Sequence, residues 1–356
     1  MEAFENLSRG FHRKQEPFCG ELRAPTGQKE NPNKQRGFNQ KMTDYIVRRF
    51  LLMIPIMLMV GIICFLLIHF IPGNPAELML GAEADSAVIA ALTKKMGYDQ
   101  PLYIQFFKWL QMVLRLDFGT SIYSHQPVIS LIAHRAEASI LIACGATILF
   151  SFFGILVGIV SAVKRNSWLD QVSMTLSLTL ASAPSFWIGL NLMLIFAATL
   201  RWLPSSGYPG VIETGNISNL RYLILPCLTI AIPSTGLIAR LTRSFFIDIL
   251  SMEYITTARA KGLKESVVLI KHALRNALIP VVAVIGSYFA EIVSLSVVIE
   301  TVFNVPGVGR LVVESILQRD YPTLQALLML IAGLYVIVNF LCDIIYAVLD
   351  PRIQYD

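Results

Sequence analysis

Charged residues are scarce in this sequence of 356 residues. Asp, Glu, Lys and Arg together make up 15% of the chain, whereas apolar residues make up 55% and the mean hydropathy is +0.61. A soluble domain carries about 25% charged residues. This chain therefore lacks the charge to coat a soluble surface of its size, and its apolar content excludes a disordered or collagen-like protein. The composition predicts a chain embedded in lipid.

The sequence also lacks the patterns of a metal site, a disulfide framework and a nucleotide-binding loop. Four of its five cysteines lie inside apolar runs, and no two stand at metal-ligand spacing, which favours a role as small apolar side chains. No Gly-x-x-x-x-Gly-Lys-Ser/Thr segment is present, so the chain has no phosphate-binding loop of its own. No constellation of His, Asp or Ser at one depth suggests an enzyme.

A polar tail at residues 1–41 precedes the apolar part of the chain. It contains Pro17, Pro25 and Pro32, mixed charges and no apolar period, which predicts disorder. It contains no apolar h-region either, so it is not a secretory signal peptide. We expect the membrane domain to occupy residues 42–356.

Six long apolar stretches follow, and crossing a bilayer takes about 20 apolar residues in a helix. They predict an all-α membrane protein with six transmembrane helices. Pro184 in the third stretch should bend its helix, and Pro226 and Pro233 in the fourth are tolerable where neighbouring helices satisfy the freed backbone groups. The stretches are Val47–Phe70, Ser139–Val163, Val172–Leu200, Tyr222–Ser244, Ala277–Ile299 and Leu324–Leu349.

The positions of Lys and Arg predict the orientation. Arg48 and Arg49 precede the first stretch, and Lys164 and Arg165 lie in the turn between the second and third. The connection between the fourth and fifth, residues 245–276, is also rich in cations, whereas the connections after the third and fifth carry few. Cytoplasmic loops carry an excess of Lys and Arg, so we expect both termini and the 245–276 loop to face the cytoplasm.

The outside loop at residues 71–137 contains two helical patterns, about Ala84–Met96 and Pro101–Leu116. The cytoplasmic loop contains a third, which is short and rich in small and cationic residues and ends at a glycine, the usual residue where a helix closes in left-handed geometry. An ordinary basic cytoplasmic loop would explain the positive charge, but it would not explain why small residues are followed by a glycine that ends the helix and then by a second helical run. Its residues of interest are Glu253, Thr256, Thr257, Ala258, Arg259, Ala260, Lys261 and Gly262.

This cytoplasmic segment resembles the coupling motif of ABC importer permeases, whose generic form is Glu-Ala-Ala, three residues, then Gly. The Thr-Ala-Arg-Ala-Lys-Gly reading of residues 257–262 and the segment His272–Pro280 are similar to the dipeptide, oligopeptide, glutathione and nickel permeases. Thr256 stands where the generic motif has Glu, and Arg275 stands where it has Pro, and both departures are typical of this subgroup.

Four other segments support the same resemblance, which covers residues 42–356. Ile71–Ala76 resembles the subgroup's Pro-Gly-Asp-Pro-Ala, with Asn74 in place of Asp. The remaining three match its first and third outside loops; they are Asp99–Leu102, Asp117–Ser121 and Val298–Arg310.

The resemblance implies an inner-membrane permease subunit that is not itself an enzyme and holds no cofactor. It implies a second homologous permease, two ABC ATPase subunits that carry ATP and Mg, a periplasmic or lipid-anchored substrate-binding protein, and no nucleic acid. The implied cargo is a di- or oligopeptide or glutathione, with a nickel chelate as the alternative within the family. A self-sufficient secondary transporter, the alternative from another class, would need midplane charge networks and usually internal repeats.

Glu291 lies near the middle of the fifth stretch. An ionised group at the bilayer centre costs about 2.5–3.5 kcal/mol on insertion scales. Such a residue either faces the translocation path or a partner subunit, or is a protonated or hydrogen-bonded packing residue. The sequence leaves both interpretations open.

Overall fold

The computed structural model describes residues 32–70 and 85–349, which form helices and loops without a β-strand. This confirms the all-α prediction. The chain divides into two units, residues 1–45 and residues 46–354. Helix α2 (Pro32–Phe70) begins in the first unit, so residues 32–41, which we expected to be disordered, are helical. Residues 1–31 of the expected tail lie outside the described residues.

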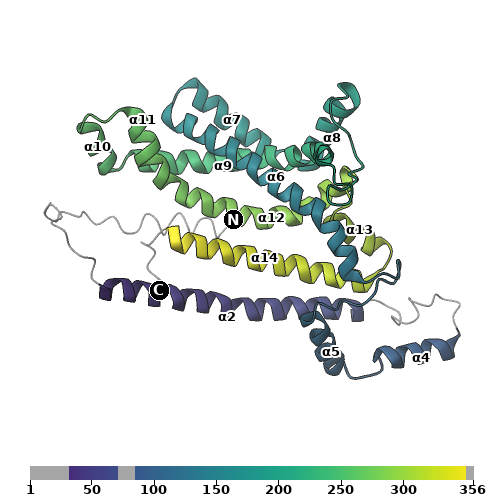
Figure 1. Cartoon of the computed structure of the whole chain (residues 1–356). Helices are drawn as coiled ribbons and strands as arrows, with labels where there is room; N and C mark the ends of the chain where they lie inside the picture. The colour runs from purple at the N-terminus through teal and green to yellow at the C-terminus, as the bar shows by residue number, and fades with distance from the viewer. Residues whose placement is uncertain (1–31, 71–84, 350–356) are drawn as a thin grey trace. The chain divides into compact units, whose positions relative to one another are not determined.

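The elements after α2 follow the predicted order (Figure 1). The loop that we expected outside holds the two expected helices. The loop that we expected on the cytoplasmic side holds three short elements, of which η3 is π-helical. The element η1 after α8 is also π-helical, whereas η2 is a 3-10 helix. In chain order the elements are α4 (Ser86–Met96), α5 (Leu102–Leu114), α6 (Val128–Val163), α7 (Trp168–Ser182), α8 (Ser185–Leu192), η1 (Met193–Thr199), η2 (Ile217–Leu223), α9 (Ile224–Leu250), α10 (Glu253–Ala260), α11 (Glu265–Val267), η3 (Val268–Leu274), α12 (Arg275–Val302), α13 (Val308–Leu317) and α14 (Tyr321–Leu349).

Five segments of the described chain are long and apolar enough to cross a membrane, and a bent pair brings the number to six. The bent pair replaces the single span expected at Val172–Leu200. It breaks between Ser182 and Ser185 by 100°, and Pro184 is the residue before α8, where the ring that fixes φ and removes an N–H ends the preceding helix. The five are Asp44–Leu67, Val128–Val163, Ile217–Leu250, Glu265–Ile292 and Tyr321–Ile345.

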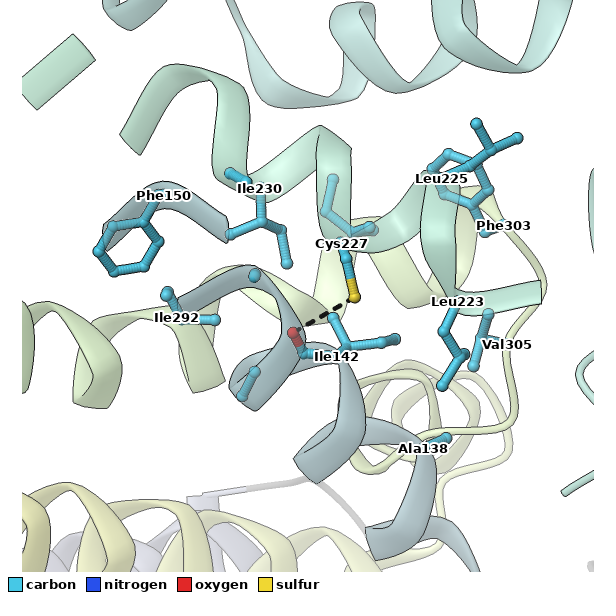
Figure 2. Packing of buried hydrophobic residues seen from close by; sticks show 14 of the residues in the cluster. Ala138, Ile142, Phe150, Leu223, Leu225, Cys227, Ile230, Ile292, Phe303 and Val305 are labelled. Carbon is cyan, nitrogen blue, oxygen red and sulfur yellow. Dashed lines mark hydrogen bonds between the residues drawn. The ribbon is translucent and has the colours of Figure 1, made fainter. Parts of the chain in front are cut away.

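The main apolar core lies where α6, α9 and α12 meet (Figure 2). Ile142 and Phe150 from α6, Ile230 from α9 and Ile292 from α12 are all at most 3% exposed. Cys227 is 6% exposed, and its Sγ lies 3.7 Å from the carbonyl oxygen of Ile142. The thiol fills a small gap in the core, as its place in an apolar run predicted.

Glycine allows α6 and α9 to approach closely. A Cβ added to Gly158 would lie 2.6 Å from both the Ala239 carbonyl oxygen and the Thr242 Cβ, and one added to Gly154 would lie 2.8 Å from Ile238. Helices in membranes associate through close van der Waals packing at small residues, because lipid tails supply no hydrophobic drive between helices. These two glycines, four residues apart, therefore set the α6–α9 crossing.

An ion pair between the buried Asp170 and the partly buried Arg243 joins α7 to α9. The Arg243 Nε and Nη2 atoms donate to the two carboxylate oxygens of Asp170 at 2.6 and 2.7 Å. Asp170 is 3% exposed and also accepts from the Asn166 backbone N–H at 2.9 Å. Asp170 lies in the first turn of α7, where the helix dipole favours a negative charge, and Ser167 caps that turn.

The α6–α9 contact predicts opposite effects for two glycine-to-alanine substitutions. Gly158→Ala should destabilise the chain by about 1–3 kcal/mol, because the added methyl overpacks against α9. Gly333→Ala in α14 is the matched control, since its Cβ would meet only the flexible end of Met57 at 3.6 Å. The control should be neutral or slightly stabilising. Thermal unfolding of the purified protein in detergent measures both, and equal melting temperatures would contradict this account of the crossing.

The Asp170–Arg243 pair predicts a cost for Asp170→Ala. Removing the carboxylate leaves the partly buried Arg243 guanidinium without its hydrogen-bond partner, which costs about 1–3 kcal/mol. The control is Glu265→Ala, which breaks the exposed Arg259–Glu265 pair and should leave the melting temperature unchanged, because exposed pairs contribute little. Comparable losses in the two variants would show that burial of Asp170 is not what makes its pair important.

Candidate functional site

The predicted cytoplasmic helix is α10, and two of its side chains hold it against the rest of the chain. Ile255 is fully buried and Ala258 is 7% exposed. Both belong to an apolar cluster with Phe246 at the end of α9, Val268 in η3 and Ala162 at the end of α6. This cluster connects α10 directly to the ends of two spanning segments.

The other side of α10 is open. Seven of the eight residues singled out from the sequence are exposed, and only Ala258 points inward. Four of these seven side chains are small, which leaves room for a second protein to approach the helix between the longer ones. The exposed seven are Glu253, Thr256, Thr257, Arg259, Ala260, Lys261 and Gly262.

Gly262 ends the α10 segment in left-handed geometry, as expected, with φ at 75°. Its N–H donates to the Arg259 carbonyl at 2.9 Å, and no atom lies within 4 Å of where a Cβ would be. The constraint at this position is therefore one of backbone conformation and not of space: a residue with a Cβ costs about 1–2 kcal/mol in this region.

Arg259 pairs within its own chain. Its Nη2 and Nε atoms donate to the Glu265 carboxylate at 2.7 and 3.2 Å, across the turn between α10 and α11. The two side chains are 43% and 55% exposed, so the pair lies at the surface. The carboxylate raises the pKa of Arg259 and keeps the guanidinium charged.

A second set of hydrogen bonds ties α10 to the start of α12. The Asn276 side-chain amide donates to the Tyr254 hydroxyl at 3.0 Å and to the His272 carbonyl at 3.1 Å. The π-helical turn η3 contains His272 and runs directly into α12. Movement of α10 is thereby connected to α12 as well as to α9.

At the opposite end of α12, Glu300 forms a buried network that the sequence analysis missed. The Ser139 hydroxyl of α6 donates to Glu300 Oε1 at 2.6 Å, and the Arg310 N–H donates to Oε2 at 2.9 Å. The Ser139 Oγ accepts from the Val308 N–H at 2.8 Å. These N–H groups belong to the first turn of α13, which is a favourable place for a carboxylate. Glu300 thus joins α6, α12 and α13.

The Glu300 network requires a glycine at position 307. A Cβ on Gly307 would collide with the Glu300 carboxyl group, and one on Gly309 would lie 2.6 Å from the Val297 Cα. The two glycines therefore allow the loop before α13 to fold back closely onto the Glu300 carboxyl group and α12.

Two further carboxylates hold loops in place. Glu137 accepts from the Tyr208 hydroxyl and the Val211 N–H, each at 2.6 Å. Burial, together with this carboxylate, raises the pKa of Tyr208. Asp320 accepts from the Ser121 hydroxyl at 2.5 Å and, through its other oxygen, from the Ile122 N–H at 3.1 Å. The loop after η1 is thereby fixed to α6, and the loop after α5 is fixed to the residue that precedes α14.

Glu291 lies on an exposed face of α12. Ser287, one turn before it, and Ser294, one turn after it, are exposed as well. The structure therefore places a polar strip, not an isolated carboxylate, along part of a membrane-spanning helix. Glu291 and α10 are separate features, which the structure does not bring into one site.

Comparison with known proteins gives two family matches that together cover most of the chain. Residues 154–355 match the model described as binding-protein-dependent transport system inner membrane component. Residues 42–143 match the corresponding N-terminal membrane component. The second match begins at the residue where we expected the membrane domain to begin.

Curated relatives match over 314 residues, which is 88% of this chain and 100% of each relative. The glutathione transport system permease protein GsiC of Salmonella choleraesuis (strain SC-B67) is 43% identical, and that of Escherichia coli (strain K12) is 40% identical. A solved amino acid ABC transporter with histidines aligns with a TM-score of 0.41 and 17% identity over 63% of this chain and 95% of that one. The family matches and the curated relatives carry the assignment: the chain belongs to the family of inner-membrane components of binding-protein-dependent transport systems.

Proposed function

We propose that this chain is the permease subunit of an ATP-driven importer of small peptides, with glutathione as the preferred member of that class. The proposed substrate class is supported by the sequence identity of 40–43% to glutathione permeases over their full length. A second homologous permease, two ATPase subunits holding ATP and Mg, and a substrate-binding protein complete the proposed transporter. Both termini and α10 face the cytoplasm in this proposal.

In this proposal α10 receives the movement of an ATPase subunit. Three features support the assignment: its exposed side is rich in small residues, its buried side contacts the ends of α6 and α9, and the Asn276 hydrogen bonds connect it to α12. A groove on the ATPase would close on the exposed side, and the shift would pass to three spanning segments. The chain supplies the docking surface, and the partner supplies the nucleotide chemistry.

The coupling assignment predicts that Gly262→Val separates transport from insertion. The left-handed backbone at Gly262 disfavours a side chain with a Cβ, so the end of α10 should fray and weaken ATPase docking. Insertion and the substrate path should be unaffected. The measurements are co-purification of the ATPase subunits and hydrolysis with and without loaded binding protein.

Gly207→Val is the matched control, because Gly207 has φ at 83° and also has open space at its Cβ, but lies in the loop between η1 and η2. It imposes similar strain away from α10 and should keep stimulated hydrolysis.

Arg259→Glu is a second test. It replaces the Glu265 ion pair with a repulsion and reverses the charge offered to the ATPase, most strongly at low salt. Full association, stimulated hydrolysis and uptake in both Gly262→Val and Arg259→Glu would refute the assignment.

Glu291 is proposed to face the translocation path or the partner permease. Its exposed position between Ser287 and Ser294 supports this, because lipid would leave a carboxylate at that depth without compensation. Glu291→Gln retains the shape and removes the charge, and should change uptake rate, substrate preference or assembly of the two permeases. Glu213→Gln, an exposed carboxylate in an outer loop, is the control and should change none of these. A Glu291→Gln variant that matches wild type in all three would support the packing interpretation.

A further inference from the structure

Helix α5 presents three different surfaces, and its contacts define the first. Phe106 and Trp109 pack on Phe65 of α2, with ring centroids 5.4 and 5.8 Å apart. The Gln105 side chain lies 3.1 Å from the Nε2 atom of His69. Phe65 and His69 lie at the end of the span Asp44–Leu67, so α5 contacts α2 at the level where that span leaves the bilayer.

The second surface of α5 is apolar and open. Tyr103 and Phe107 are each 65% exposed, and Leu114 is 77% exposed. With 3.6 residues per turn, positions 103, 107 and 114 fall on one sector, beside the one that packs on α2. Isolated exposed apolar residues need no explanation, but three large ones on one helix sector indicate that lipid or a protein partner shields them from water.

The third surface of α5 is cationic and polar. Lys108 and Arg115 are exposed and fall on a common sector, with Gln111 between it and the apolar one. The Lys108 Nζ donates to the Gln100 side chain at 2.8 Å, so this sector carries hydrogen-bonded polar groups at the surface. An apolar sector with aromatic residues, bordered by Lys and Arg, is the pattern of a helix that lies in the plane of a membrane interface.

We propose that α5 is an interfacial anchor whose Tyr103–Phe107–Leu114 sector enters the headgroup and acyl boundary of the outer leaflet. Two observations identify lipid as the occupant. The helix is held at the end of a candidate spanning segment, and that segment exposes large apolar side chains of its own, including Met59 at 65%, so α5 is attached to an element whose open surface suits lipid. Figure 1 shows α5 running across the direction of α2 near the Phe70 end of that helix.

This placement assigns a role to each surface of α5. The aromatic pair Phe106 and Trp109 fixes α5 to α2, the apolar sector resists movement out of the leaflet, and Lys108 and Arg115 extend toward lipid phosphates and water. Together these contacts set the depth of α2 in the bilayer. The proposal depends on membrane insertion and not on the cargo, so it stands or falls separately from the peptide assignment.

Depth-dependent fluorescence quenching tests the proposal on neighbouring residues. Phe107→Cys and Lys108→Cys are made in the full chain with Cys19, Cys144 and Cys342 replaced by alanine; the buried Cys64 and Cys227 remain. Each variant is co-expressed with its partner subunits, labelled with bimane and reconstituted into lipid nanodiscs. The quenchers are aqueous iodide, a phospholipid with a nitroxide high on the acyl chain and one with a nitroxide near its end. Met59→Cys is the control for a deep position.

The label at residue 107 should be quenched severalfold more by the shallow nitroxide lipid than by iodide, and the label at residue 108 should show the reverse. The label at residue 59 should respond most to the deep nitroxide. Equal iodide quenching at 107 and 108 would place the apolar sector in water and overturn the proposal. Protection of residue 107 from all three quenchers would place a protein on this sector and would also overturn it. Tyr103→Cys repeats the test on the same sector if the Phe107 variant does not assemble.

Discussion

The close crossing of α6 and α9 is the contact on which the rest of the structure depends. Gly154 and Gly158 let the two backbones approach to where any side chain would collide. Packing and polar contacts, and not the hydrophobic effect, hold helices together in lipid, so a close backbone contact is worth more there than a large apolar side chain. From this crossing α9 extends to Asp170 on α7 through Arg243 and to the α10 cluster through Phe246.

Charged side chains reinforce this arrangement at its two ends, while the apolar core occupies the middle. The Asp170–Arg243 pair lies near the turn that precedes α7, and Glu300 joins α6, α12 and α13 at the other end. A buried carboxyl group is costly unless it is paired or hydrogen-bonded. Each of these carboxylates has several donors, so the ends of the helices are held in specific positions. Helix ends held in this way suit the proposed transmission of a displacement from α10.

The sequence predicted the helices well because lipid imposes a simple rule: an apolar stretch of sufficient length must be helical. It predicted the left-handed backbone at Gly262 for a local reason, since glycine avoids the Cβ penalty there. It missed the pairing of Asp170 with Arg243 and the network of Glu300, because partners far apart in the sequence leave no periodic signal. Arg243 and Asp170 are 73 residues apart, so no local spacing indicates their contact, and Pro184 predicted a bend but not its size.

In the proposed coupling role, anchoring and docking place opposite demands on α10, and its buried and exposed faces are suited to one demand each. Ile255 and Ala258 supply a modest apolar contact that keeps the helix attached to the spanning segments. The Arg259–Glu265 pair lies at the surface, where an ion pair contributes little to stability. In the proposed docking role, Arg259 would exchange Glu265 for an acidic group on the partner at little net cost. Buried apolar contacts on one face and exchangeable surface charges on the other are what that proposal requires of a helix that binds and releases a partner repeatedly.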